Sequence, residues 1–248
     1  MRFLVDPHTH TISSGHARST VRENALAAKQ AGMEGICCTD HGPAMAGAAV
    51  EFIVTVLADG PEFIEGVRVI NGTEANIIDY SGNLDISDQY LKYTDFAIAS
   101  LHDNVVIPGS KLQNTEAMIG ALSNPYIDVI GHPGNSAFQV DAEAVVEAAK
   151  DMNKLIEINN NSFIYRKGSY QNCVKFLRLC KQKDVRIAVS SDAHTCYQVG
   201  RFEHVINLLE KLAFPEELVV SRSLKTFNEY LRERKTRIKK KCAENRID

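Results

Sequence analysis

The stretch Phe3-Leu4-Val5-Asp6-Pro7-His8-Thr9-His10 joins a short apolar run to two histidines, and a third histidine follows at position 16. A short apolar run that ends at polar residues is typical of a buried strand. Because alternate residues of an extended segment point to the same side, His8 and His10 are expected to project together. The chain has only eight histidines in 248 residues, so this cluster indicates a site built at a strand end.

Apolar runs alternate with helical patterns along nearly the whole chain, as is typical of βα units around a parallel sheet. The predicted strands cover residues 3–6, 35–39, 67–72, 95–100, 127–131, 155–159 and 186–190. The predicted helices cover residues 18–31, 44–58, 113–122, 141–152, 170–183, 201–212 and 223–241. Seven consecutive βα steps favour a TIM-like (βα)7 barrel over an open sheet, and we expect residues 1–248 to form one domain.

Two segments depart from this alternation. The polar segment 77–89 is predicted to be a turn or short hairpin inserted after the third strand. The last predicted helix ends in the charged run 232–241, and a charged C-terminal helix usually presents a solvated face. We therefore expect this segment to lie on the surface without an anionic partner.

Overall charge and hydropathy argue against nucleic-acid and membrane partners. With 28 basic and 31 acidic side chains the formal net charge is −3, so the overall field gives no reason to expect nucleic acid. No apolar run approaches the roughly 18 residues of a membrane helix, and the N-terminal run is too short for a secretory signal. The six cysteines show no CxxC pair, which fits a reducing compartment. We expect a soluble cytoplasmic protein, and the sequence leaves homo-oligomer formation open.

Histidines and carboxylates follow the predicted strands at their carboxyl ends, where barrel enzymes build their sites. The candidate ligands are His8, His10, His16, His41, Glu74, His102, His132, Asp192 and His194. Imidazole and carboxylate groups suit zinc, manganese or iron, and nine such groups exceed the need of one tetrahedral ion. Two or three ions are therefore predicted, because so many titratable groups without a metal would leave unpaired polar atoms. His204 lies inside a helical pattern, and we expect no such role for it.

The charge of such a site predicts an anionic substrate. Three divalent ions would bring +6, whereas Glu74 and Asp192 return only −2. A metal-bound water is a nucleophile near neutral pH, and adjacent metals can hold both the attacking and leaving oxygens of a phosphoryl group. Metal-assisted phosphoester hydrolysis is the leading prediction, since no P-loop or nucleophile elbow favours another chemistry.

Three other functions remain open. A phosphodiesterase or nuclease linked to DNA repair would use the same metals but needs a groove for the polymer. An amidohydrolase-like hydrolase would share the HxH ligands, but no lysine lies at a strand end where a bridging lysine ligand is expected. A non-catalytic metal-binding module would need a site with no open coordination position.

These residues resemble the PHP family (polymerase and histidinol phosphatase), and within it the branch of YcdX-like phosphatases. The shared motifs extend through almost the whole chain: HTH…H at 8–16, TDHGP at 39–43, EANI at 74–77, NT.AMI at 114–119, HPGN at 132–135, EINN.SF at 157–163, RKGS..NC at 166–173 and SDAHT at 191–195. The resemblance implies a distorted seven-stranded barrel that holds three divalent ions, normally zinc and sometimes manganese or iron. It also implies a phosphatase that acts on small phosphorylated metabolites.

The matching motifs divide the ligands among three ions. By this resemblance the first ion takes His8, His10, Glu74 and Asp192, the second takes Glu74, His102 and His132, and the third takes His16, His41 and His194. Glu74, Asp192 and His194 would act in catalysis through a metal-bound water that attacks phosphorus. The family usually reads DLHxH where this chain has Pro7. Because proline cannot donate a ladder hydrogen bond, we expect a local adjustment of the strand without loss of a metal.

Several residues outside the ligand set are further candidates. Arg166 and Lys167 follow the sixth strand as candidate substrate-binding residues, and one of them is predicted to hold the substrate phosphate, with a solvated loop as the equal alternative. Lys111 is a weaker candidate of the same kind. Glu157 and Asn159 alternate along a strand and are expected to orient histidines. Asp40 precedes His41 and is expected to be a hydrogen-bond partner or turn residue, with a general acid as the alternative.

Overall fold

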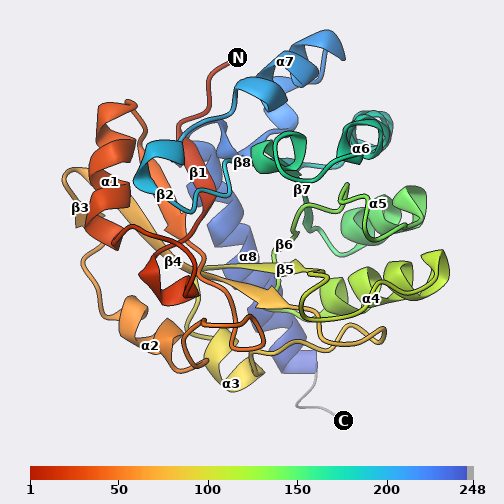
Figure 1. Cartoon of the computed structure of the whole chain (residues 1–248), viewed down its shortest axis with the longest axis horizontal. Coiled ribbons are helices and arrows are strands. Elements are labelled where there is room, and N and C mark those ends of the chain that lie inside the picture. Colours follow the sequence, from red (N-terminus) through yellow and green to blue (C-terminus); the bar gives the residue numbers. More distant parts are fainter. Residues whose placement is uncertain (245–248) are drawn as a thin grey trace.

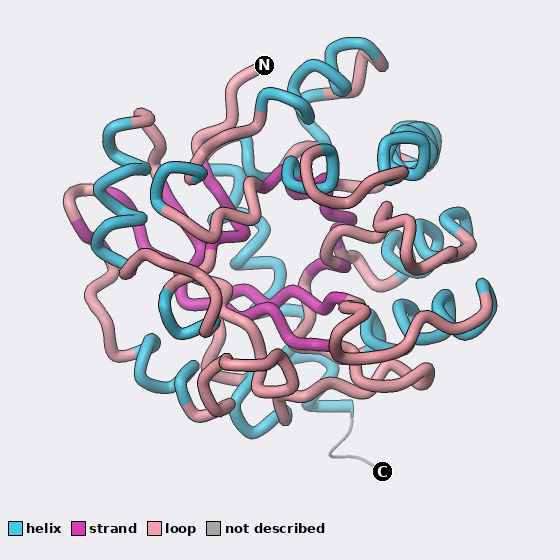
Figure 2. The backbone as a smooth tube through the Cα atoms, viewed as in Figure 1, coloured by secondary structure: helices cyan, strands magenta, loops and turns pink. Residues whose placement is uncertain are grey.

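In the computed structural model, which describes residues 1–244 and side chains up to Lys240, parallel strands form a ring around the centre of the molecule (Figure 2). Around the ring these strands are β1 (Val5–Thr9), β2 (Gly35–Cys38), β4 (Val67–Asn76), β5 (Phe96–Ser100), β6 (Val129–Ile130), β7 (Leu155–Asn159) and β8 (Ile187–Ser190). Neighbours on this path pair in parallel, and β3 (Phe63–Ile64) adds to β4 in antiparallel orientation. The predicted seven-stranded α/β barrel is confirmed for the described residues.

The ring closes between β1 and the loop that follows β8, where no regular strand ladder forms. The amide of His10 donates to the carbonyl of Ala193 at 2.8 Å, and the amide of Asp192 donates to the carbonyl of His8 at 3.0 Å. The barrel is therefore distorted at this seam. Three of the predicted ligands are carried by the segments that form it.

Pro7 lies inside β1, where the pairing with β2 is irregular. Asp6 pairs with Ile36 and Thr9 pairs with Cys38, so Pro7 and His8 together lie opposite a single residue of β2. Proline has no amide hydrogen to donate to the ladder, and a bulge accommodates this loss. The expected local adjustment is present.

Helices cover the outside of the ring (Figure 1). They are α1 (Val21–Gln30), α2 (Ile53–Ala58), α3 (Asp88–Leu91), α4 (Lys111–Ser123), α5 (Ala142–Asp151), α6 (Ser169–Lys183) and α7 (Glu203–Lys211). Thr20 and Ser110 begin α1 and α4 with capping boxes, and the Asp141 carboxylate caps α5. No helix of residues 1–244 is long and apolar enough to cross a membrane.

The boundaries of three predicted elements are wrong. The strand predicted over 3–6 covers Val5–Thr9 instead, so His8 lies within β1 and does not follow it. The helix predicted over 44–58 begins only at Ile53, because Gly47 adopts a φ of +86° and packs closely on Gly15, which holds the preceding segment in turns. The strand predicted over 67–72 continues to Asn76, so Glu74 lies within β4 and does not follow it. The short hairpin predicted over 77–89 is present, with Ile77 paired to Leu84.

The C-terminal helix α8 (Leu224–Glu244) crosses behind the ring (Figure 1) and closes the amino-terminal end of the barrel. Its buried residues Phe227, Tyr230 and Leu231 pack with the first residues of the strands in one apolar cluster. This stripe follows the i, i+3, i+4 spacing of an amphipathic helix and continues to Arg234. The surface position expected for the charged run 232–241 is therefore wrong at Arg234, which is buried. Cys37, Cys38, Cys173, Cys180 and Cys196 are free, and the side chain of Cys242 lies outside the described residues.

Arg234 ties α8 to the base of the barrel. Its Nε lies 2.6 Å from Oδ2 of the fully buried Asp128, and its guanidinium also donates to the Thr94 carbonyl at 2.9 Å. Arg234→Ala leaves Asp128 with Arg237 and Tyr230 as its remaining side-chain partners. We expect the free energy of unfolding to fall by about 2 kcal/mol, somewhat less than for a buried charge with no other partner. Urea denaturation measures the loss, with the exposed Arg232→Ala as control. An equal, small effect of both substitutions would contradict the structural role of Arg234.

Candidate metal centre

The predicted ligands meet at the carboxyl ends of the strands, and six of them line a cleft made of two adjoining cavities of about 480 and 410 Å³. His8, His10 and His132 are buried beside it. His8 and Glu74 lie within β1 and β4. The remaining candidates extend from the loops that follow the strands: His10, His16, His41, His102, His132, Asp192 and His194. Residues separated by as many as 186 positions therefore share one site.

Glu74 lies at the centre of this site and is buried. Both its carboxylate oxygens face imidazoles, at 3.1 and 3.4 Å from Oε1 and 2.8 to 3.5 Å from Oε2. The five rings around it belong to His8, His10, His41, His102 and His132. A carboxylate with a separate group of ring nitrogens at each oxygen has the geometry of a bridging ligand.

His8, His10 and Asp192 converge on one side of Glu74. The Nε2 atoms of His8 and His10 lie 3.0 Å apart, and Asp192 Oδ1 lies 3.2 Å from Nε2 of His10 and 3.6 Å from Nε2 of His8. Several electron-pair donors so close together are typical of a metal site. The structure thus brings together the residues that the family motifs assign to the first predicted ion.

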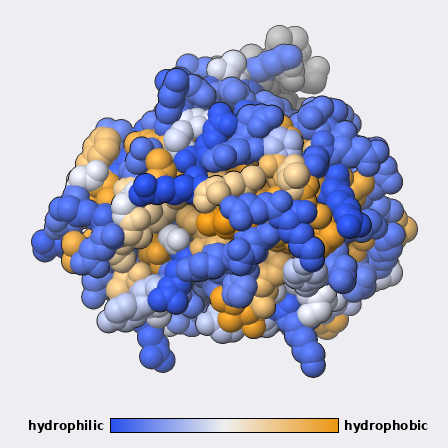
Figure 3. Space-filling model, turned by 90° about the horizontal axis from the view of Figure 1, so that it is seen from above, coloured by the Kyte–Doolittle hydropathy of each residue, from blue (hydrophilic) through white to orange (hydrophobic). Residues whose placement is uncertain are grey.

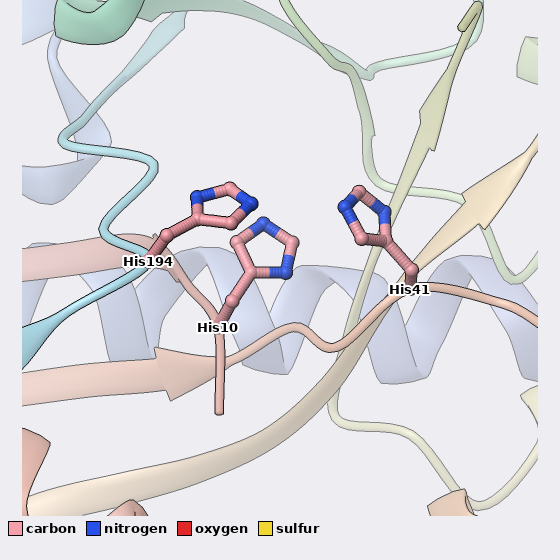
Figure 4. Close-up of side chains that lie close together, drawn as sticks. All are labelled: His10, His41 and His194. Atoms are coloured by element: carbon pink, nitrogen blue, oxygen red, sulfur yellow. The ribbon is translucent and has the colours of Figure 1, made fainter. Parts of the chain in front are cut away.

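His16, His41 and His194 form a second group of neighbouring rings, next to His10. Nε2 of His194 is 2.9 Å from Nε2 of His16, and the ring centroids of His16 and His41 are 5.1 Å apart. Figure 4 shows His10, His41 and His194 arriving from different loops with their rings close together, and their ligand atoms lie within 4.8 Å of one another. His10 therefore adjoins the third predicted set as well as the first.

Two buried atoms of the site have no hydrogen-bond partner among the described residues. They are Nδ1 of His41 and Oε2 of Glu74, which lie 2.8 Å apart but lack the alignment of a hydrogen bond. Unpaired buried polar atoms are costly, and a divalent cation would satisfy both. Imidazole nitrogens and carboxylate oxygens are ligands of zinc, manganese and iron, so the residues present fit metal ions.

Glu157 orients two of the histidines. Its Oε1 accepts from Nδ1 of His8 at 2.6 Å, which leaves Nε2 of His8 directed at the site, and its Oε2 accepts from the backbone amide of His132. Asn159 donates to Oδ2 of Asp192 at 3.0 Å. The orienting contact predicted for Glu157 is present, and Asn159 positions a carboxylate instead of a histidine.

Further orienting contacts come from residues that the sequence did not single out. Ser14 Oγ lies 2.9 Å from Nδ1 of His10 and donates to Oδ1 of Asp40 at 2.6 Å. Asn76 accepts from Nδ1 of His102 at 2.8 Å. Asp40 also accepts from the amide and hydroxyl of Thr11, so the hydrogen-bond role expected for it is confirmed.

Two proposed ligands have left-handed backbone conformations. His132 has φ +29° and Asp192 has φ +58°. Such conformations cost about 1–3 kcal/mol for residues other than glycine, and they persist where the surroundings enforce them. Here the enforcing contacts include Glu157 on the amide of His132 and the β1 carbonyl of His8 on the amide of Asp192.

Electrostatics keep most of the site in the protonation states of metal ligands. Although burial favours the neutral acid, the charges of nearby histidines hold the pKa of Glu74 and Asp192 well below the usual range. Burial lowers the pKa of His10 well below 6.5, and burial and the charge of Arg166 lower that of His132 to about 4. Burial opposes charge on His8 too, but neighbouring carboxylates, including Glu74, raise its pKa well above 6.5.

The predicted substrate-binding residues differ in their position relative to the metal cleft. Arg166 lines both cavities of the cleft, and its guanidinium donates to Oδ2 of Asp192 at 3.0 Å. Lys167 is exposed and, among the described residues, is not one of those that line the cleft. Lys111 is paired with Asp141 at 3.4 Å.

Comparison with known proteins gives a consistent result. The family model described as "PHP domain" matches residues 6–164. A probable phosphatase of Acetivibrio thermocellus is 51% identical over 97% of this chain and 100% of its own length, and one of Caldanaerobacter subterraneus subsp. tengcongensis is 48% identical over 96% and 94%. The histidinol phosphate phosphatase of Lactococcus lactis, solved with zinc, L-histidinol and phosphate, has a similar fold with a TM-score of 0.57. It is 17% identical, and the match covers 87% of this chain and 95% of that one.

Proposed function

The chain belongs to the PHP domain family, and we propose that it is a metal-dependent phosphatase that hydrolyses small phosphate monoesters. The observation that carries this proposal is the convergence of imidazoles and two carboxylates beside Arg166 in one open cleft. The names of relatives that are about half identical to this chain over nearly its whole length support it. We further propose that residues 1–248 form one domain of this kind.

We propose that the cleft holds three divalent ions, zinc in the first place and manganese or iron as alternatives. His8, His10, Glu74 and Asp192 would hold the first, Glu74, His102 and His132 the second, and His16, His41 and His194 the third. When bound, such ions supply a water of lowered pKa and a positive field for phosphate. The position of Glu74 between two groups of histidine nitrogens supports its role as a shared ligand.

The side chains of this cleft have distinct tasks in the proposed reaction. Arg166 would donate to the non-bridging oxygens of the substrate phosphate, because guanidinium groups form directional, charge-assisted hydrogen bonds. Its bond to Asp192 fixes its position before the substrate arrives. Nδ1 of His194 lies 2.9 Å from the carbonyl of Asp192, so it donates there and directs Nε2 towards the cleft. Glu74, Asp192 and His194 are thus the proposed catalytic residues.

The proposed function is tested with the purified full chain on an aryl phosphate monoester and the matching diester. We expect turnover of the monoester to stop after complete chelation and to return on addition of zinc or manganese. Activity that survives complete removal of metal would contradict the proposal. A diester hydrolysed much faster than the monoester would favour a phosphodiesterase instead.

Ser14→Ala tests whether the hydrogen-bond chain from Asp40 holds His10 in place. Loss of the hydroxyl frees Nδ1 of His10, and loss of such an orienting partner typically weakens metal binding by about 10- to 100-fold. Competition with a metal indicator measures the affinity, and Ser13→Ala is the matched control because its hydroxyl makes no described contact with the site. Equal affinity in the two variants would contradict an orienting role for Ser14.

A further inference from the structure

A second hollow of about 640 Å³ opens beside the metal cleft, and Arg166 lines both. We propose that this hollow binds a second anionic group of the substrate, so that the preferred substrates carry another phosphate or a carboxylate besides the scissile phosphate. The inference rests on the proposed phosphatase function. It gives that function a substrate class.

The charge of the hollow supports an anionic ligand. Its basic lining residues are Arg166, Lys167 and Lys211, and none of the described residues that line it is acidic. Neither Lys167 nor Lys211 has an ion-pair partner among the residues that the structure describes. Two exposed ammonium groups without carboxylate partners at one concave site produce a positive field that attracts anions.

The walls of the hollow come from the loop after β7 and from two helices. α6 begins at Ser169, and the helix dipole places positive partial charge at this end of the hollow. The Ser169 hydroxyl is buried and has no hydrogen-bond partner among the described residues. Phe163 and Tyr170 contact each other edge to face at 6.1 Å and provide an apolar wall.

α7 supplies the opposite wall, with His204 and Lys211 at its two ends. Phe163 stacks on His204 with ring centroids 6.2 Å apart. Figure 3 shows the molecule from above, which is the side on which α7 lies in Figure 1. On this face hydrophobic side chains lie between hydrophilic ones. A small ligand with an anionic end and an uncharged body matches this mixed lining.

Arg166 connects the hollow to the metal cleft. One amino group of its guanidinium donates to Oδ2 of Asp192 at 3.0 Å, and the other lies 3.5 Å from Oγ of Ser162, which lines the hollow. A phosphate among the metal ligands and a second anion near Lys211 would therefore lie on either side of the same guanidinium. Lys167 lines the hollow and is not among the described residues that line the cleft, so it would contact the second anion and not the scissile phosphate.

The experiment compares hydroxyalkyl phosphates with alkanediol bisphosphates and carboxyalkyl phosphates of equal chain length. In the unmodified chain we expect the doubly anionic esters to have about tenfold higher kcat/KM, with an advantage that shrinks as salt is added. In the Lys167→Gln/Lys211→Gln double variant the ratio of kcat/KM for doubly anionic esters to kcat/KM for singly anionic esters should fall to about one. Lys150→Gln, an exposed lysine of α5, should leave it unchanged.

Comparison of the two doubly anionic series tells a second phosphate from a carboxylate as the preferred group. The inference would be overturned if doubly and singly anionic esters had nearly equal kcat/KM in the unmodified chain. It would also be overturned if the ratio of these two values were the same in the double variant as in the unmodified chain. Failure of every ester to react would contradict the proposed function instead. In that case calorimetric binding of the bisphosphate tests the hollow directly: about tenfold weaker binding by the double variant would support the anion site, and equal binding would overturn it.

Discussion

Glu74→Gln is expected to lower kcat/KM for a phosphate monoester by about 1,000-fold or more, with the fold intact. The substitution keeps the size of the side chain but removes the charge that faces imidazoles at both of its oxygens. An amide nitrogen in place of one oxygen cannot act as a ligand and would direct hydrogens at a histidine nitrogen. Loss of this shared ligand would affect two proposed metal positions at once.

The measurement combines steady-state kinetics with metal analysis of the purified variant. Glu116→Gln is the matched control, because Glu116 is exposed on α4 and the same chemical change there should leave both values unaltered. Circular dichroism and a urea transition separate loss of metal from loss of fold. A Glu74→Gln protein with full metal content and full turnover would refute the central role of this carboxylate.

The strand order and the barrel could be predicted from sequence because each βα unit carries its own local pattern. Helix starts such as Asp141 were also predictable, since a capping side chain lies beside the amides that it binds. The extension of β4 to Asn76 was not predictable, because it depends on pairing with β5 that places Glu74 opposite Ile98. The packing of α8 under the barrel was hidden by its high charge, since the burial of Arg234 depends on distant partners such as Asp128 and the Thr94 carbonyl.

For the candidate site, sequence reasoning found the side chains that carry donor atoms but few of the residues that orient them. The histidines were conspicuous because they are rare and follow strands. Ser14 and Asn76 are common polar residues, and their contacts with His10 and His102 depend on how loops fold over the barrel. Sequence reasoning likewise could not tell which of Arg166 and Lys167 reaches the metal cleft: both line the hollow beside it, but of the two only Arg166 also lines the cleft.

The protonation state of His8 distinguishes it from the other proposed ligands. Burial works against a charge on His8, but the carboxylates of Glu74, Glu157 and Asp192 hold its pKa well above 6.5. The pKa of His10 is lowered well below 6.5, and that of His132 is lowered to about 4. Just below pH 6.5 the metal-free site therefore carries a proton on His8, while the rings of His10 and His132 are already neutral.

Metal affinity is expected to rise about tenfold per pH unit just below pH 6.5, because the proton on His8 must leave before Nε2 can bind an ion. Affinity rises with pH because the pKa of His8 is raised: below that pKa, each unit of pH increases the deprotonated fraction of His8 tenfold. Titration of the metal-free protein with zinc against a chelator of known affinity measures the slope.

Glu157→Gln removes one of the carboxylates that raise the pKa of His8, so the metal affinity of this variant should rise less steeply with pH. The Glu116→Gln variant should keep the pH dependence of the unmodified chain. The two variants remove the same charge, and only Glu157 touches His8. A flat profile in the unmodified chain would mean that His8 carries no proton. A slope near two would mean that a second ligand titrates with it, and either result would contradict the assignment of a single proton to this buried ring.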